Sequence, residues 1–306
     1  MTHSNLDYSI IVPLFNEMES LPKLQQAISS TMPDMGLMSY EVIYVDDGSA
    51  DDSWKILQIF VESDSHVQAI RLPCHSGKAT ALAAGISRAE GKIIITLDAD
   101  LQNDPNDIPQ LIAKISDGSD LVCGWRKNRH DSKERVVLSW LFNVILEVVS
   151  GIDLHDVNCG FKAGKAEVFK SLKLYGQLHR YIPLLAIAHG FKVSETHIRH
   201  HPRRFGKSRY GLIRYFHAAR DLPVALTIAK WSSVPKESNI VFRIATVITV
   251  VSCIAAAFLF APWAGIASVV SSVLLGIWLF YEQHKYVAYG LSCIKKRLPL
   301  DSQKLC

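Results

Sequence analysis

The feature that most constrains this chain is an uncharged run of 38 residues, 244–281. About 20 apolar helical residues cross a bilayer core, so a run of this length suits two crossings better than one. Pro-Trp-Ala-Gly at 262–265 lies at its middle and predicts a tight turn. We therefore expect a transmembrane helical hairpin within residues 239–289. The alternative is a buried helical hairpin in a soluble protein.

Charges on either side of this run predict its orientation. Arg243 precedes it, Lys285 follows it, and the tail at 290–306 contains Lys295, Lys296 and Arg297. Positively charged flanks stay on the cytoplasmic side of a membrane. The N-terminus lacks the basic region of a signal peptide. We expect an integral protein of the cell (inner) membrane, with the bulk of the chain and both termini in the cytoplasm.

The charge of the chain is unevenly distributed. The net charge is +4, yet residues 199–243 contain ten Lys or Arg and only two acidic residues. Within this basic stretch, residues 212–238 are predicted to form juxtamembrane amphipathic helices that lie in the membrane interface. The alternative is a solvated helix face that packs on the rest of the chain. The six cysteines form no C-x-x-C pair, which indicates reduced thiols rather than a zinc site or a disulfide framework.

The first 125 residues alternate short apolar runs with amphipathic ones, and a composition of 49% apolar residues excludes a disordered chain. The predicted strands are 8–12, 41–45, 67–72, 92–97 and 120–123. The predicted helices are 19–31, 51–63, 77–90 and 106–117. This alternation is typical of an α/β protein with a doubly wound, mostly parallel sheet. Ligands of such sheets bind beyond the carboxyl ends of the strands.

Three of the predicted strands end in polar clusters, at residues 13–17, 46–49 and 98–102. One such cluster can be an Asx turn, but three at one edge of a sheet indicate a site. Asp98 and Asp100 are two residues apart, so on a strand both carboxylates would project from the same face. Oxygen ligands favour Mg²⁺ or Mn²⁺. The alternative for this pair is a structural turn.

The motifs together resemble a known family. Ser9–Glu17, Val45–Ser49 and Leu97–Gln102 resemble the successive signatures of family 2 nucleotide-sugar glycosyltransferases. Asp156–Lys162, His179–Pro183 and Arg203–Tyr210 extend the resemblance to the polyprenyl-phosphate glycosyltransferases, the group of dolichol-phosphate mannose synthase and bactoprenol glucosyltransferase. The resemblance covers about residues 8–290. It implies a GT-A-like cytoplasmic catalytic domain at 1–211, followed by the amphipathic helices and the two-helix membrane hairpin.

The resemblance also implies roles for the matching positions. The nucleotide sugar would be bound by Pro13, Phe15, Asn16, Glu17, Asp46, Asp47, Gly77, Lys78, Asp98 and Ala99. Asp98 and Asp100 would hold the metal ion on the diphosphate. The catalytic positions would be Asp156, Asp100, Gln102 and Arg126. The phosphates, including that of the lipid, would face Arg126, Arg203, Ser208 and Arg209. A solvated basic face is the alternative for each arginine, and a loop cap is the alternative for Asp156.

The expected reaction is therefore an inverting, metal-dependent hexosyl transfer. One sugar would move from a nucleoside diphosphate sugar, UDP-glucose or a related UDP-sugar, to polyprenyl (undecaprenyl) phosphate at the cytoplasmic membrane face. A phosphate acceptor is already largely a dianion at neutral pH, so Asp156 would orient the donor sugar or the acceptor rather than act as an obligatory base. The expected partners are the two substrates, the lipid bilayer and further copies of the chain, without nucleic acid.

Other functions fit the sequence less well. A non-catalytic membrane-bound binding or scaffold subunit of a glycan-modification system remains an alternative, although the acidic motifs are intact. Gln177–Tyr181 approximates the Q-x-x-R-W of processive polysaccharide synthases, but two membrane crossings are too few for a polymer channel. A nicotinamide-dependent oxidoreductase is excluded, because no G-x-G-x-x-G follows the first strand.

Overall fold

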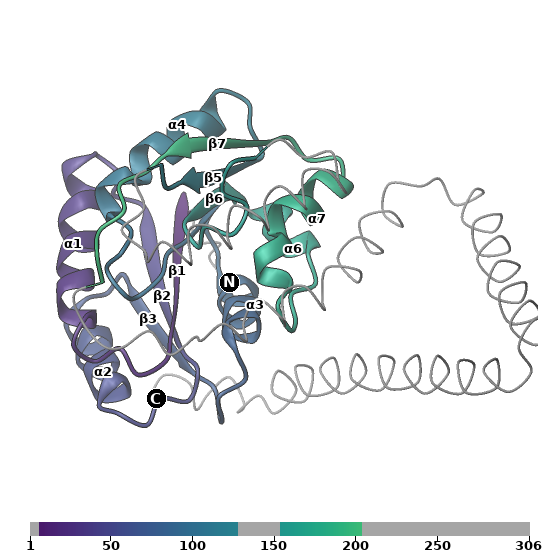
Figure 1. Ribbon diagram of the computed structural model, residues 1–306. Helices are drawn as coiled ribbons and strands as arrows, with labels where there is room; N and C mark the ends of the chain where they lie inside the picture. Colours follow the sequence, from purple (N-terminus) through teal and green to yellow (C-terminus); the bar gives the residue numbers. More distant parts are fainter. Residues whose placement is uncertain (1–5, 128–153, 204–306) are drawn as a thin grey trace, which may run out of the picture. The chain divides into compact units, whose positions relative to one another are not determined.

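The computed structural model describes residues 6–127 and 154–203 (Figure 1). The expected juxtamembrane helices, membrane hairpin and basic tail lie outside these residues, as do Ser208 and Arg209. In the described part of the chain, no helix is long and apolar enough to cross a bilayer.

Within the described residues, seven strands form one sheet in the order β3-β2-β1-β4-β6-β5-β7. The strands are β1 (Tyr8–Leu14), β2 (Tyr40–Asp46), β3 (Val67–Arg71), β4 (Ile93–Thr96), β5 (Leu121–Trp125), β6 (Lys162–Lys165) and β7 (Val193–His197). Only β6 runs antiparallel to its neighbours, β4 and β5. The remaining pairs are parallel, which confirms the prediction of a mostly parallel sheet.

Helices cover both faces of this sheet (Figure 1). One face carries α1 (Leu21–Asp34), α2 (Ser53–Ser63) and α4 (Ile108–Ser116). The other carries α3 (Lys78–Arg88), α6 (Ala166–Ser171) and α7 (Ile182–Ala188). Two short 3₁₀ turns, η1 (Pro105–Asp107) and η2 (Leu178–Tyr181), precede α4 and α7. The four helices expected from the sequence correspond to α1, α2, α3 and α4, so the doubly wound arrangement is confirmed.

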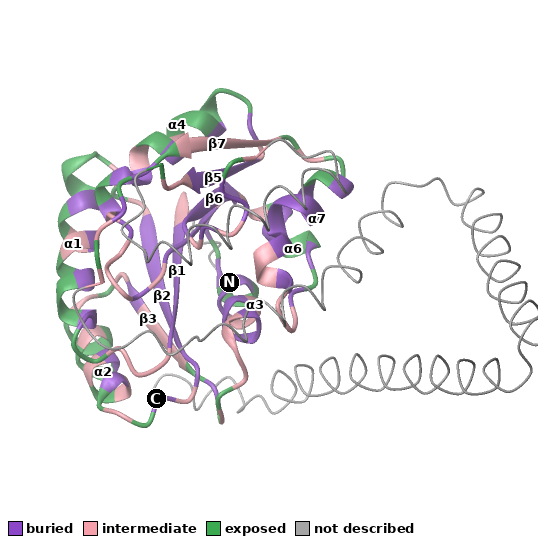
Figure 2. Ribbon diagram, viewed as in Figure 1, coloured by how far each residue is buried: buried purple, intermediate pink, exposed green. Residues whose placement is uncertain are grey.

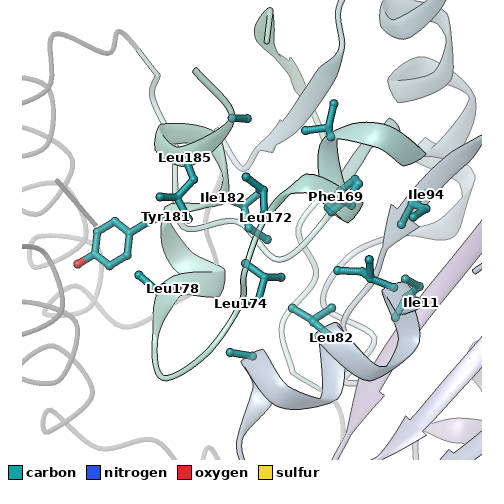
Figure 3. Close-up of a cluster of buried hydrophobic side chains, with 14 of the residues drawn as sticks. Ile11, Leu82, Ile94, Phe169, Leu172, Leu174, Leu178, Tyr181, Ile182 and Leu185 are labelled. Atoms are coloured by element: carbon teal, nitrogen blue, oxygen red, sulfur yellow. The ribbon is translucent and has the colours of Figure 1, made fainter. Parts of the chain in front are cut away.

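Alternating side chains of the central strands fill the two cores. In β1, Ile11 belongs to the core on the α3 side, whereas Ile10 and Val12 belong to the core on the α1 side. Figure 2 shows the sheet buried between the two helical layers, whose outer faces are exposed. Figure 3 shows the core on the α3 side, where Leu82 and Phe169 pack towards Ile11. This double burial explains why the strands are continuous apolar runs.

Strand β6 has no counterpart among the sequence predictions, because Lys-Ala-Gly-Lys lacks any apolar pattern. Its side chains are small where it packs between β4 and β5. A Cβ at Gly164 would lie 2.9 Å from the carbonyl oxygen of Asp120. Lys162 is buried, and its ammonium group donates to the carbonyl oxygen of Cys159. Tertiary packing, rather than hydrophobicity, makes this segment a strand.

Strand β4 ends at Thr96, earlier than the sequence predicts, and this corrects one expectation. Asp98 and Asp100 both lie beyond the end of the strand, and Asp100 lies in a turn, so strand alternation is not what brings them together. Leu101 in the same turn has a φ of +59°, a backbone conformation that a leucine rarely adopts. Residues 99 and 100 form a turn just beyond the carboxyl end of β4.

Candidate active site

The loops that follow β1 and β2 are joined to each other by hydrogen bonds. Asn16 has a φ of +55°, and its amide oxygen accepts from the backbone N–H of Ala50 at 2.7 Å. Its own backbone N–H donates to Ser49 Oγ at 2.8 Å, and that of Glu17 donates to Ser53 Oγ at 2.9 Å. Asn16 therefore holds the two loops together, a role that sequence reasoning did not assign to it.

Asp47 performs a similar task for the segment that begins α3. Its carboxylate accepts from the backbone N–H groups of Ser76 at 2.7 Å and Gly77 at 2.8 Å, and from His75 Nδ1 at 2.8 Å. Burial raises the pKa of Asp47 overall, although these hydrogen bonds act in the opposite direction. The neighbouring Gly48 has a φ of +75°, and a Cβ there would lie 2.7 Å from the backbone of Cys74. The 46–49 loop and the start of α3 thus form one tightly packed unit.

An aromatic pair stands beside this unit. The rings of Phe15 and His75 are stacked with their centroids 4.0 Å apart. His75 Nδ1 lies against Asp47, and no hydrogen bond is formed by His75 Nε2 within the described residues. Nearby, Asp46 is fully buried and accepts from the backbone N–H of Ser49, while its Oδ2 lies 3.3 Å from Arg71 Nε without hydrogen-bond geometry. The pair offers a flat surface and a ring nitrogen to a ligand.

Lys78 and Asp98 come together from different elements. The Lys78 ammonium group, at the start of α3, contacts Asp98 Oδ1. Burial alone would raise the pKa of Asp98, but Lys78, with Arg126 and Lys162 further away, lowers it overall. A Cβ at Gly160 would lie 2.3 Å from Asp98 Oδ2, so only glycine leaves room beside that oxygen. The Asp98 carboxylate is thus kept ionised at this site.

Asp100 and Glu17 share one arginine. Arg203 donates to Glu17 Oε1, and its second terminal nitrogen lies 3.6 Å from Asp100 Oδ2. Burial, followed by the charge of Asp98, raises the pKa of Asp100 to about 6. A neighbouring negative charge disfavours the ionised form of a carboxyl group, which is the direction in which Asp98 acts on Asp100. Gln102 follows in the same turn, and its backbone N–H donates to Asp100 Oδ1 at 3.2 Å.

Arg126 and Asp156 form a bidentate pair. Arg126 Nε donates to Asp156 Oδ2 at 2.7 Å, and its NH2 donates to Asp156 Oδ1 at 3.0 Å. The two side chains are only 14% and 4% exposed. Such parallel, charge-assisted bonds fix both groups strongly. Sequence reasoning assigned Arg126 to phosphates and Asp156 to a substrate, and the structure shows that the two also position each other.

The structure separates the candidate residues into two groups. Around the carboxyl edge it brings together Phe15, Glu17, Lys78, Asp98, Asp100, Gln102, Arg126, Asp156 and Arg203, with Asn16, Asp46, Asp47 and Gly77 holding the loops. Pro13 and Ala99 are different. Pro13 is buried within β1, and Ala99 is 4% exposed and packs in the core on the α1 side. Both contribute to packing rather than to the surface of the site.

Sequence reasoning missed the site residues His75, Gly160 and Lys162. His75 lies just before Gly77 and Lys78, which the resemblance assigned to the nucleotide sugar, and that proximity was its signal. Gly160 and Lys162 lie in a recognised motif, but the packing of Gly160 against Asp98 and the burial of Lys162 beside Cys159 depend on the tertiary structure. No local sequence pattern predicts such contacts.

The carboxylates of Asp98 and Asp100 suit a divalent metal ion. Both present oxygen, the donor that Mg²⁺ and Mn²⁺ prefer, and the Asp98 carboxylate packs against Gly160, where any side chain would displace it. Among the described residues, no three His, Cys, Asp or Glu side chains are arranged to hold a metal ion. Two carboxylates plus the phosphate oxygens of a substrate are a common arrangement for these ions, so the residues present fit the ion when a substrate completes its shell.

A doubly wound sheet with clustered carboxylates and cations beyond its strand ends defines the class of α/β proteins that bind their ligands at the carboxyl ends of the strands. Within that class, the chain belongs to glycosyl transferase family 2, whose model matches residues 9–173.

Relatives of known activity cover most of the chain. It is 34% identical over 236 residues to dodecaprenyl-phosphate galacturonate synthase of Rhizobium johnstonii. This match covers 76% of this chain and 70% of that protein. It is 36% identical over 220 residues to undecaprenyl-phosphate 4-deoxy-4-formamido-L-arabinose transferase of Klebsiella pneumoniae. This match covers 72% of this chain and 67% of that protein. The family resemblance of the motifs is confirmed.

Solved structures support the fold. Glucosyl-3-phosphoglycerate synthase from Mycobacterium tuberculosis, crystallised with Mn²⁺, uridine diphosphate and phosphoglyceric acid, matches with a TM-score of 0.55 and 18% sequence identity. The match covers 76% of this chain and 80% of that one. At this level of identity the likeness concerns the fold, and it confirms the GT-A-like, mostly parallel sheet.

Proposed function

We propose that this protein transfers a single sugar from a nucleoside diphosphate sugar to a polyprenyl phosphate. The relatives named above act on dodecaprenyl or undecaprenyl phosphate, as their names state. The observation that carries the proposal is the row of ion pairs beyond the strand ends. Lys78 meets Asp98, Arg203 meets Glu17 and Asp100, and Arg126 meets Asp156. A transfer between two phosphates needs this combination of carboxylates and cations.

The donor fits along the line from Phe15 to Asp98. The stacked Phe15–His75 pair offers a platform for the nucleobase, and Lys78 lies three residues further along the chain, against Asp98. Three residues span at most about 10 Å, which matches the reach from a base to its diphosphate. Lys78 also stands in the first turn of α3, where exposed N–H groups favour anions. The proposed donor is UDP-glucose or a related UDP-sugar.

A divalent ion, Mg²⁺ or Mn²⁺, is proposed to be held by Asp98 and Asp100. When bound, it would neutralise charge on the departing nucleoside diphosphate. Lys78 contributes to the same end, because its ammonium group is already directed to this place. With the ion and the diphosphate present, Lys78 and Arg203 have phosphate oxygens available in place of the carboxylates that they contact here.

The acceptor requires positioning rather than proton removal. A phosphate monoester with a second pKa near about 6 is largely a dianion at neutral pH, so it attacks without a base. Arg126 and Arg203 provide the positive charge that holds it in line with the anomeric carbon. Asp156 fixes the guanidinium of Arg126 through two hydrogen bonds, which orients that cation. In-line attack inverts the anomeric configuration.

We further propose a membrane location for the reaction. The domain at 1–211 would lie in the cytoplasm, the helices of 212–238 in the membrane interface, and the hairpin of 239–289 in the bilayer. The basic tail at 290–306 would return to the cytoplasmic side, and the protein would form homo-oligomers. The 38-residue uncharged run and the excess of basic residues before it support this arrangement.

The test is a screen of nucleotide sugars with undecaprenyl phosphate and the full chain in detergent. Each reaction contains Mg²⁺, Mn²⁺ or EDTA, and the glycolipid product is identified by mass. Asp98→Asn serves as the inactive control. We expect one UDP-sugar to give a singly glycosylated lipid phosphate with either metal and none with EDTA. Absence of product from every sugar would favour a non-catalytic subunit, and product in EDTA would disprove the metal assignment.

A further inference from the structure

Trp125 lies between two histidine rings. Its indole stacks on His155 with centroids 3.8 Å apart and on His197 with centroids 4.2 Å apart. Trp125 ends β5, and His197 ends β7 directly opposite it in the parallel register. His155 comes from a third segment, which precedes β6. The proposed reaction has no task for this three-ring stack.

Glu195 ties the third segment to the sheet. Its Oε2 accepts from the backbone N–H of His155 at 2.9 Å, and its Oε1 contacts Nδ1 of the same residue. His155 is therefore held twice, by its ring on β5 and by its backbone and Nδ1 on β7. A residue held at both ends has little freedom to move.

The two stacked residues Trp125 and His155 are each next in sequence to one member of the buried Arg126–Asp156 ion pair. Trp125 precedes Arg126, and His155 precedes Asp156, whose carboxylate receives both hydrogen bonds of that arginine. We propose that His155, through its stack on Trp125, is a positioning residue for Asp156. It sets the register in which Asp156 meets Arg126. This inference rests on the proposed function, since it assigns the pair a task in phosphate binding.

The geometry of the pair makes register important. Two parallel N–H···O bonds of 2.7 and 3.0 Å form only when both planes and both positions match. Misplacement of a reacting or orienting group by about 1 Å can reduce a rate on the order of 100-fold. Removal of the His155 ring should therefore lower turnover, while the nucleotide platform at Phe15 and His75 is untouched.

A matched control exists at the opposite edge of the sheet. His66, directly before β3, stacks on Tyr40 with centroids 4.5 Å apart. Its backbone N–H and its Nδ1 both contact Asp64, as those of His155 contact Glu195. Its side chain is 41% exposed, against 54% for His155. His66→Ala therefore removes the same kinds of contact at a place remote from the site.

The experiment compares His155→Ala with His66→Ala in the full chain in detergent. We expect kcat to fall about tenfold or more for His155→Ala, with the KM of the donor within about twofold, and both values to remain near wild type for His66→Ala. In an Asp156→Asn background, His155→Ala should have little further effect, because its target is gone. Equal effects of the two alanine variants, or full additivity with Asp156→Asn, would overturn the inference.

A spectroscopic readout separates this inference from the proposed function. The Arg126 Nε–H resonance, assigned by its loss in Arg126→Lys, should shift in His155→Ala and stay in place in His66→Ala. If wild type transfers no sugar, the proposed function fails, yet this resonance still tests the positioning. Should His155→Ala not fold, His155→Phe keeps a ring on Trp125 and His155→Gln keeps a donor for Glu195. If the stack positions Asp156, the Arg126 Nε–H resonance keeps its wild-type position in His155→Phe and shifts in His155→Gln. A shift in His155→Phe with the wild-type position in His155→Gln would contradict the inference.

Discussion

The ammonium group of Lys78 contacts Oδ1 of Asp98, although the two residues come from the beginning of α3 and from the turn after β4. The pair joins a cation suited to a diphosphate with a carboxylate suited to a metal ion. Both side chains are between a quarter and a third exposed, at 27% and 30%. The contact therefore lies at an accessible surface, where a substrate can replace it.

Lys78→Met should weaken binding of the nucleotide sugar. It removes the cation that we assign to the diphosphate, and loss of one charge-assisted contact of about 1.5–3 kcal/mol corresponds to roughly a 10- to 100-fold rise in KM. Lys92→Met is the matched control, because Lys92 forms an exposed ion pair with Asp7 at 2.8 Å, at the amino-terminal edge of the strands. Steady-state kinetics with varied donor checks this. An equal rise in both variants would remove Lys78 from the site.

His75→Ala should weaken the binding of free nucleotide as well as of nucleotide sugar. It removes one ring of the stacked pair with Phe15, and base–aromatic stacking is worth about 1–3 kcal/mol. His75→Asn keeps a hydrogen-bonding group beside Asp47 but no ring, so it should bind weakly too. Isothermal titration with UDP gives the affinities. Unchanged affinity in both variants would place the base elsewhere.

Asp156→Asn should lower turnover about 100-fold or more without shifting the pH profile between about pH 7 and 9. An amide can accept only one of the two hydrogen bonds of Arg126, so that cation loses its orientation. If Asp156 were a general base, the wild-type kcat would depend on the ionisation of Asp156, and this pH dependence would be lost in Asp156→Asn. The pH profile of kcat and the anomeric configuration of the product, determined by NMR, distinguish these two roles of Asp156. Retained configuration would disprove in-line attack.

His179 should reduce the stability of the protein in acid. Burial, then the charges of Arg180, Lys78 and Lys162, lower its pKa well below the usual value of 6.5. The unfolded chain therefore binds a proton that the folded chain does not. Stability falls as pH decreases below about 6.5, by up to about 1.4 kcal/mol per pH unit.

Denaturant unfolding of wild type and His179→Leu at pH 7 and pH 5 measures this contribution. The variant should lose less stability on acidification than wild type. The comparison cancels the contribution of Asp100, whose pKa is raised to about 6 and whose effect therefore has the opposite sign. Identical losses in the two proteins would show that His179 is protonated when folded.

Truncation after Pro235 should leave UDP binding intact and impair use of the long-chain lipid. The proposed hairpin lies beyond this point, and the residues proposed to bind the nucleotide lie before it. Turnover with a short, soluble prenyl phosphate should fall much less than turnover with undecaprenyl phosphate. Sedimentation with vesicles supplies the second measurement. If the shortened protein binds vesicles as firmly as the full chain, the hairpin is not the anchor.

The sequence by itself determined the elements whose signals are local. The runs of Ile and Val in β1, β2 and β4 are buried on both faces, so composition alone marks them as central parallel strands. The polar clusters at their ends fall at one edge, because parallel strands share a direction. The fold class, the edge that holds the site and most of its acidic residues therefore follow from pattern and order along the chain.

Only the tertiary structure decided which charged groups become partners. Arg126 meets Asp156 from 30 residues away, and Arg203 reaches Glu17 from 186 residues away. Strand β6 likewise exists because Lys162 and Gly164 fit between β4 and β5, although their residue types do not favour a strand. Pairing depends on which strand ends and loops meet in space, and the energies involved arise from burial and distance. Local residue preferences contain neither quantity, so these contacts could not be predicted from the sequence.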